Sequence, residues 1–197
     1  MSLLRDGTMA TLRQQLEVIA NRHRAVIKVS HERLDNLSDA QLRWAPDEKT
    51  WSIALILDHL IKVHTSTSGP FMKALLPAPL AGDERTKELS YSFIDRKFVQ
   101  LLSPGARFKL PVPKLYVPVV HNGPAHGLVT HFQEELDAFT VILEYADEKK
   151  LKGLKVLSPA GSLKPSIIAY LDATVQHDRY HWIQIETLLR HGQFPKS

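Results

Sequence analysis

Residues 51–60 read WSIALILDHL, and this stretch shows most clearly which kind of fold the chain adopts. Ser52, or Thr50 just before it, can cap the free backbone N–H groups at a helix start. Apolar residues then recur at three- and four-residue steps, the spacing of one helix face: Ile53, Ile56, Leu57, Leu60, Ile61 and Val63. The helix should break or bend at Gly69-Pro70, because proline has no N–H group and its ring clashes with the preceding turn. The apolar pattern can nevertheless continue briefly beyond it, through Phe71, Met72, Leu75 and Leu76.

Three further segments carry the same periodicity, and we expect helices over residues 8–37, 125–148 and about 162–190. In the last of these, Ser162 is the expected cap and Pro165 falls in the first turn, where a missing N–H does no harm. His191-Gly192 is the expected stop signal.

Shorter signals complete the pattern. Ser38 and Gln41 have the spacing of a capping box, which predicts a short helical turn after the first helix. Lys114–Val120 has the composition of a strand, but its prolines argue against one. The chain is therefore predicted to be all-α, a four-helix bundle with a long connection between its second and third long helices.

That connection runs from Pro77 to Pro124 and holds seven of the twelve prolines. One short amphipathic segment interrupts it, with one face formed by Tyr91, Ile94, Phe98 and Leu101. Connections of this length are uncommon in compact domains and usually serve as lids or binding loops. A plain spacer over the bundle is an equally good interpretation.

The bulk properties fit one ordinary globular domain. The chain has 197 residues, of which 44% are hydrophobic and 23% charged, so we expect a single domain over residues 1–197 with residues 77–124 as an insert. No run approaches the 18 or so apolar residues that cross a bilayer, and no signal peptide is recognisable. We expect a cytoplasmic protein without a membrane partner.

Charge and cysteine content exclude further classes. The net charge of +4 suggests nucleic acid at first, but basic and acidic residues alternate and no recognition motif accompanies them, so we expect no nucleic-acid partner. The chain has no cysteine, which removes disulfides, thiolate nucleophiles and iron–sulfur clusters. Any metal ion would need nitrogen and oxygen ligands.

His177 and His181 are the main candidates for such ligands. Residues four apart on a helix lie on the same side, so two imidazoles can converge on one ion. The chain has ten histidines, however, and about 0.5 such pairs are expected by chance. On spacing alone, a structural pair is slightly the better interpretation.

A metal site needs a third ligand from another helix, and His59 is the best candidate. It lies among Ile56, Leu60 and Val63 on the second long helix. The alternative is ordinary, since a lone histidine on an apolar face is more often a core residue hydrogen-bonded to a neighbour.

Two motifs resemble those of one family. The stretch Trp51–Leu60 resembles the W-S-I-x-x-I-x-x-H-L signature of the DinB/YfiT-like (DinB_2) superfamily, and Leu42-x-Trp44-x-Pro46 is similar to the element before it. Near the C-terminus, HDRYHWIQI at residues 177–185 resembles the family's H-x-x-x-H-x-x-Q-I. The two motifs have the expected order and distance, and the likeness covers the chain apart from the proline-rich insert.

The resemblance implies an up-down-down-up four-helix bundle with a three-histidine metal site. Carried over by motif, the ligands are His59, His177 and His181, with water completing the coordination of one divalent ion such as Zn, Ni or Fe. Three histidines and an open position are the pattern of a catalytic zinc site rather than a structural one.

The implied function is a metal-dependent enzyme acting on a small molecule. Related activities include thiol-dependent transferases and isomerases, which use a low-molecular-weight thiol, and hydrolases. The main alternative is a non-catalytic metal-binding or stress-associated protein, and a third interpretation is an apolar-ligand module without metal. A homodimer is expected by analogy only. The catalytic residues are not identifiable from the sequence.

The remaining polar residues are expected to lie at the surface. Four carboxylates could orient the histidines, but each is better explained as a surface charge: Asp58, Asp178, Glu134 and Glu135. Four other histidines are interpreted as surface or loop residues: His64, His121, His126 and His131. Among these, His64 is the best candidate for an additional residue of the site.

Overall fold

The computed structural model describes residues 10–106, 111–159, 161 and 163–196. Within them the chain is helical and contains isolated β-bridges but no strand, which confirms the all-α prediction. Its α-helices are α1 (Leu12–Leu34), α2 (Asp39–Arg43), α3 (Ile53–Leu75), α4 (Phe93–Leu102), α5 (His126–Glu148) and α6 (Ile167–Leu189). Two short 3₁₀ helices are η1 (Gly82–Thr86) and η2 (Lys114–Tyr116).

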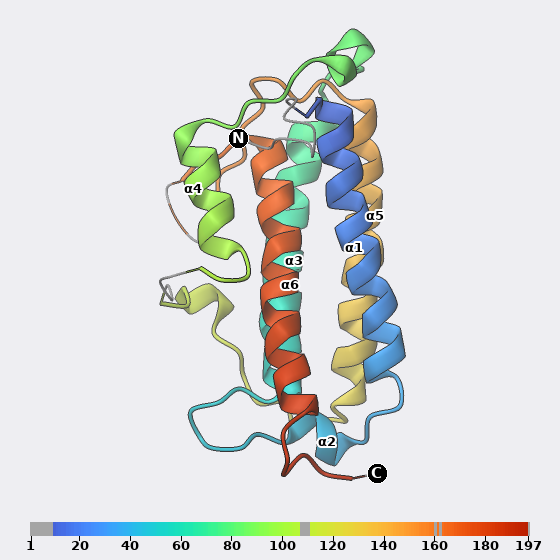
Figure 1. Ribbon diagram of the computed structural model, residues 1–197, viewed down its shortest axis with the longest axis vertical. Coiled ribbons are helices and arrows are strands. Elements are labelled where there is room, and N and C mark those ends of the chain that lie inside the picture. The colour runs from blue at the N-terminus through green and yellow to red at the C-terminus, as the bar shows by residue number, and fades with distance from the viewer. Residues whose placement is uncertain (1–9, 107–110, 160, 162, 197) are drawn as a thin grey trace.

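The four long helices, α1, α3, α5 and α6, lie side by side along the long axis of the molecule (Figure 1). Helices α1 and α6 run in one direction, and α3 and α5 run in the other (Figure 1). Helices α5 and α6 each contact both α1 and α3, so the four enclose a shared interior. None of the described helices is long and apolar enough to cross a membrane.

The apolar faces read from the sequence fill this interior. Fully buried side chains come from every long helix: Ile19, Leu57, Phe71, Phe132, Phe139 and Leu171. Burying one such side chain contributes roughly 1.5–3 kcal/mol. Burial along one face of each helix therefore stabilises the helices together more than their individual propensities do.

Side-chain hydroxyls cap the starts of the first three helices, including the predicted positions Ser38 and Ser52. The hydroxyls of Thr11, Ser38 and Ser52 accept hydrogen bonds from backbone N–H groups at the starts of α1, α2 and α3. Thr11 and Ser38 form complete capping boxes, which confirms the one predicted at Ser38. The predicted start of the first helix at residue 8 lies outside the described residues.

The helix does not break at Gly69-Pro70, because α3 continues to Leu75 along the apolar pattern that the sequence carries beyond the proline. Serine and threonine hydroxyls around the proline bond to carbonyls one turn earlier: Ser66 and Thr67 to Val63, and Ser68 to His64. Continuing the helix also buries Phe71 and Leu75 completely. Tertiary burial therefore outweighs the cost of the missing N–H group.

Ser166, not Ser162, caps the last helix, and Pro165 precedes the helix instead of lying in its first turn. The residues before Ser166 are extended and pair with the loop after α5: Val156 N–H donates to the Pro165 carbonyl, and Ile167 N–H donates to the Leu154 carbonyl. This pairing delays the start of α6. Ser162 itself lies outside the described residues.

The long connection is partly packed against the bundle. Helix α4 contacts α6 and buries Phe98 as predicted, but Ile94 is 57% exposed, contrary to the predicted face. Asp95 is buried instead, because its carboxylate accepts hydrogen bonds from Ser92 and from the Ser166 N–H.

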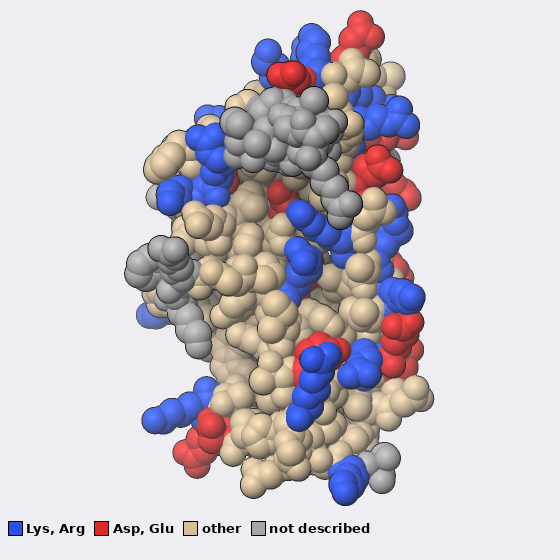
Figure 2. Space-filling view, in the orientation of Figure 1, with Lys and Arg blue, Asp and Glu red and all other residues tan. Residues whose placement is uncertain are grey.

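One face of the molecule is shown in Figure 2, where Lys and Arg are interspersed with Asp and Glu and a broad uncharged area remains. The segment around η2 contributes exposed apolar side chains: Leu115, Val117, Val119 and Val120. On this face the basic side chains form no continuous stripe (Figure 2).

Candidate metal centre

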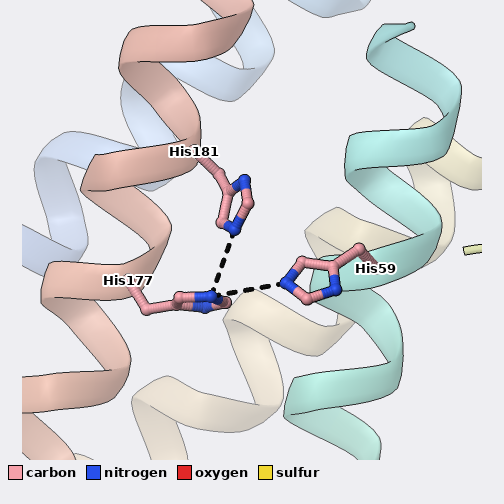
Figure 3. Close-up of side chains that lie close together, drawn as sticks. All are labelled: His59, His177 and His181. Atoms are coloured by element: carbon pink, nitrogen blue, oxygen red, sulfur yellow. Dashed lines mark hydrogen bonds between the residues drawn. The ribbon is translucent and has the colours of Figure 1, made fainter. Parts of the chain in front are cut away.

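Three imidazole rings converge between α3 and α6. His59 extends from α3, and His177 and His181 extend from successive turns of α6 (Figure 3). His177 Nε2 lies 3.3 Å from His59 Nε2 and 3.1 Å from His181 Nε2. The three ligand atoms lie within 4.8 Å of one another, so this group could hold a metal ion. The structure thus brings together all three histidines predicted from the sequence.

Local helix geometry and core packing position these rings. The i,i+4 spacing places His177 and His181 on one side of α6. His59 lies almost two turns beyond the capped start of α3, between the buried residues Ile56 and Leu60. His59 and His181 are themselves buried, whereas His177 is half-buried and is the most accessible of the three.

The outer nitrogens of two rings have defined partners. His59 Nδ1 donates to the Tyr116 carbonyl oxygen at 2.7 Å, and His181 Nδ1 donates to Gln184 Oε1 at 2.9 Å. Since these oxygens only accept, the ring proton lies on Nδ1 in each case. Both Nε2 atoms therefore present lone pairs to the centre of the group, the tautomer that a metal ion requires.

The group is not satisfied by hydrogen bonds alone. A proton on His177 Nε2 can satisfy only one of the two lone pairs that face it at a time. His177 Nδ1 is buried and has no hydrogen-bond partner among the described residues. The Nε2 acceptors face one another in a mostly buried place, and a positive charge between them would satisfy them.

Burial keeps the three rings neutral. It is the largest influence on each and lowers the pKa of His59, lowers that of His177 well below its usual value, and lowers that of His181 to about 3. Mutual repulsion adds to this effect for His177 and His181. Neutral imidazole is the form that binds metal ions.

Aromatic side chains surround the histidines. The Trp51 ring lies 5.3 Å from His59 and is stacked on His181 at 6.3 Å, and the Tyr180 ring lies 5.1 Å from His181. Such apolar surroundings limit access of water and lower the local dielectric.

Two surface hollows lie elsewhere. One, of about 570 Å³, is lined by Asp39, Arg43 and residues 120–124, and the other, of about 400 Å³, by residues 79–87, Lys150 and Lys152. Neither is lined by any of the three histidines. Of the three histidines, His177 is the one whose side chain keeps some exposure to solvent.

Asp58 is not the surface charge that was predicted, since it is only 4% exposed. Its carboxylate accepts hydrogen bonds from Val119 N–H and His121 and pairs with Lys62. Burial alone would raise the pKa of Asp58, but these partners lower it. Asp58 thus holds the segment after η2 against α3, and η2 itself supplies the Tyr116 carbonyl to His59.

His64 and Asp178 are also buried, which corrects the predicted surface positions of both. Neither side chain is exposed, and His64 Nε2 lies 3.0 Å from Asp178 Oδ1. Burial alone would lower the pKa of His64, but the Asp178 carboxylate raises it. The pair joins α3 to α6 within the interior.

The remaining candidates lie outside the histidine group. Glu134 is exposed as predicted, and Glu135 is half-buried and accepts a hydrogen bond from Thr65. His121, His126 and His131 are exposed, which agrees with their predicted surface or loop positions.

Sequence reasoning missed two groups that orient the site. Gln184 lies three residues after His181, so helical spacing could have revealed its contact. The Tyr116 carbonyl could not be found in this way, because every residue has a carbonyl and only the tertiary fold selects one.

Comparison with known proteins agrees with the motifs. The family profile described as the DinB superfamily matches residues 22–185. No curated protein and no solved structure shows a significant match to the chain. The matched region contains all three histidines, Gln184 and the long connection.

Proposed function

The chain belongs to the DinB superfamily, and we propose that it is a metal-dependent enzyme acting on a small molecule, with one divalent ion held by His59, His177 and His181. The observation that carries this proposal is the convergence of three neutral imidazoles whose Nε2 atoms lack enough donors. A purely structural cluster would pair these acceptors with N–H or O–H groups.

The residues present fit a metal ion. Two nitrogens bound to one tetrahedral zinc ion at about 2.0–2.1 Å lie about 3.3 Å apart. His177 Nε2 lies 3.3 Å from His59 Nε2 and 3.1 Å from His181 Nε2. The outer hydrogen bonds of His59 and His181 match the second layer of contacts that metal-binding histidines usually have.

An all-imidazole donor set suits zinc, nickel or iron rather than calcium or magnesium. Three protein ligands leave a coordination position for a substrate or water. A divalent cation there would deprotonate a coordinating thiol or lower the pKa of a bound water molecule.

A thiol fits these surroundings better than water as the activated group. Water attack usually relies on a general base within hydrogen-bond reach, and the nearest carboxylates in sequence are engaged elsewhere, Asp58 by the η2 segment and Asp178 by His64. The chain has no cysteine, so the thiol would come from a low-molecular-weight cosubstrate. We therefore favour thiol transfer or isomerisation over hydrolysis.

One observation favours the alternative of a non-catalytic metal-binding protein. The two surface hollows described above are not lined by the histidines, and aromatic rings pack around the group. A protein that only binds the ion would have such a closed arrangement.

The proposal also includes the order and direction of the four long helices. We assign the chain an up-down-down-up four-helix bundle forming one domain, supported by the opposite directions of α1 and α6 relative to α3 and α5 (Figure 1).

Metal analysis tests the proposal. Metal-free protein titrated with Zn²⁺, Ni²⁺ or Fe²⁺ should bind one equivalent, and the His59→Ala variant should bind none. His131→Ala, which removes an exposed histidine of α5, is the matched control and should bind like the wild type. If wild-type protein held no more metal than His59→Ala, the site would be rejected.

Activity assays then separate the two functions. Loaded protein should turn over electrophiles in the presence of small thiols, and thiol addition should change the visible spectrum of Co²⁺-loaded protein. Bound metal without turnover or thiol binding across a broad panel would support the non-catalytic alternative.

A further inference from the structure

The buried pair of His64 and Asp178 spans the same two helices that supply the three histidines. His64 lies five residues after His59 on α3, and Asp178 directly follows His177 on α6. Their side chains are 0% exposed and are joined by a 3.0 Å hydrogen bond. The site's own geometry does not use either side chain.

Stability alone does not explain this pair. Taking a carboxylate and an imidazole out of water costs several kcal/mol, and replacement of such buried pairs by apolar residues is often neutral or stabilising. Here the cost is increased, because His64 Nδ1 and Asp178 Oδ2 have no hydrogen-bond partner among the described residues.

What a hydrogen bond adds is direction. Apolar contacts between two helices are non-directional and tolerate small shifts of one helix along the other, whereas a 3.0 Å bond between side chains does not. Metal coordination needs donor positions within about 0.2 Å of ideal distances. The α3–α6 seam is therefore where a small shift would be most harmful.

We propose that His64 and Asp178 are positioning residues that hold α6 in register with α3, so that His177 and His181 meet His59. This inference rests on the proposed metal site. The pair contributes little to stability and much to metal affinity.

His23 offers a matched comparison inside the same core. It is also buried, lies edge-on to Phe139 as His64 does, and likewise has an Nδ1 atom without a hydrogen-bond partner in the described part of the chain. Its Nε2 atom, however, bonds to the Leu136 carbonyl and Thr140, so it joins α1 to α5. Replacing His23 therefore measures the effect of removing a buried histidine that does not connect α3 to α6.

The experiment measures Zn²⁺ affinity by chelator competition and, separately, the denaturation midpoint of metal-free protein. In the double variant His64→Leu with Asp178→Leu, we expect a midpoint equal to or above that of the wild type and a Zn²⁺ Kd raised about 10–100-fold. Asp178→Asn keeps an acceptor for His64 and should restore a Kd within a few-fold of the wild type. His23→Leu should shift the midpoint and leave the Kd unchanged.

An unchanged Kd in a folded double variant would overturn the inference, as would an equal loss of affinity in His23→Leu. A double variant that no longer folds would also overturn it, since the pair would then maintain the fold itself; Asp178→Asn remains measurable in that case. Failure of the proposed function looks different, because wild-type protein and His59→Ala would then bind Zn²⁺ equally poorly.

Discussion

Helix α6 carries two buried polar clusters, and they are satisfied in opposite ways. The first centres on Asp172, and the second contains His177 and His181, five and nine residues later. The Asp172 carboxylate accepts hydrogen bonds from four side chains of the protein: Gln15, Arg22, Tyr91 and Gln176. In the histidine group, by contrast, ring nitrogens face one another: His177 Nε2 lies 3.1 Å from His181 Nε2 and 3.3 Å from His59 Nε2.

We interpret the Asp172 cluster as structural and the histidine group as the proposed metal site. At Asp172 an acceptor meets donors from α1, α6 and the segment before α4, so the cluster ties these elements together without outside help. In the histidine group the atoms that meet are all ring nitrogens, and the outer nitrogens of His59 and His181 are fixed by Tyr116 and Gln184. A cation bound between the three rings, as we propose, would satisfy all three inner nitrogens at once.

The largest expected effect comes from removing a central ligand. His177→Ala and His181→Ala should each weaken Zn²⁺ binding by more than the ~10–100-fold that a lost outer contact costs. Zn²⁺ at 100 times its Kd should stabilise wild-type protein by about 2.7 kcal/mol and should not stabilise these variants. Thermal denaturation with and without Zn²⁺ measures this. Equal stabilisation of all three proteins would place the metal elsewhere.

The Asp172 cluster should show the reverse behaviour. Asp172→Ala removes the acceptor for several buried donors and should lower the free energy of unfolding by about 3 kcal/mol. Zn²⁺ affinity of the folded variant should stay within a few-fold of the wild type. Urea denaturation and chelator competition give the two numbers. A large loss of Zn²⁺ affinity in Asp172→Ala would contradict the proposed difference between the two clusters.

Acid should destabilise the metal-free protein through the histidine group. The pKa values of His59, His177 and His181 are lowered in the folded state, by burial above all, so the unfolded chain binds more protons below pH 6.5. The free energy of unfolding should therefore fall as the pH drops below 6.5, by at most about 1.4 kcal/mol per pH unit for each histidine.

The Asp172 cluster contributes with the opposite sign. Burial raises the pKa of Asp172, so its contribution to stability is present at low pH and is lost as the pH rises through the folded-state value. Urea denaturation of the wild type and of a His59→Gln, His177→Gln, His181→Gln variant between pH 4 and pH 7 checks the histidine contribution. A slope that is equally steep in both proteins would contradict it.

The smallest expected effect concerns an outer contact of the site. Gln184→Leu removes the acceptor of His181 Nδ1 and should raise the Zn²⁺ Kd about 10-fold. Gln176→Leu is the matched control, because Gln176 lies on the same helix but bonds to Asp172. If both variants lost the same affinity, the effect would reflect helix packing in general.

Helical periodicity and caps are local properties, and for this reason the sequence predicted the long helices well. The capping box at Ser38 and the cap at Ser52 depend on side chains and N–H groups two or three residues apart. Local patterns were less decisive where distant segments intervene. Burial of Phe71 carries α3 past Pro70 without a break, and pairing with the 154–158 loop moves the cap of α6 from the predicted Ser162 to Ser166.

The acidic residues show the same limit. Asp58 and Asp178 were placed at the surface, because adjacent helical residues point about 100° apart and their neighbours His59 and His177 face the interior. Each is nevertheless buried, since the η2 segment covers one and α3 contacts the other. A helix covered on several sides has no single polar face, and its periodicity does not reveal how many sides are covered.

The sequence by itself determined which residues could bind a metal ion and on which helices they lie. Spacing brought His177 and His181 to one side of α6, and the motif around His59 indicated the third ligand. Only the tertiary structure decided that the three rings meet, that Tyr116 and Gln184 orient two of them, and that His64 and Asp178 join the same helices. These outcomes depend on contacts between residues far apart in the chain, which no local pattern encodes.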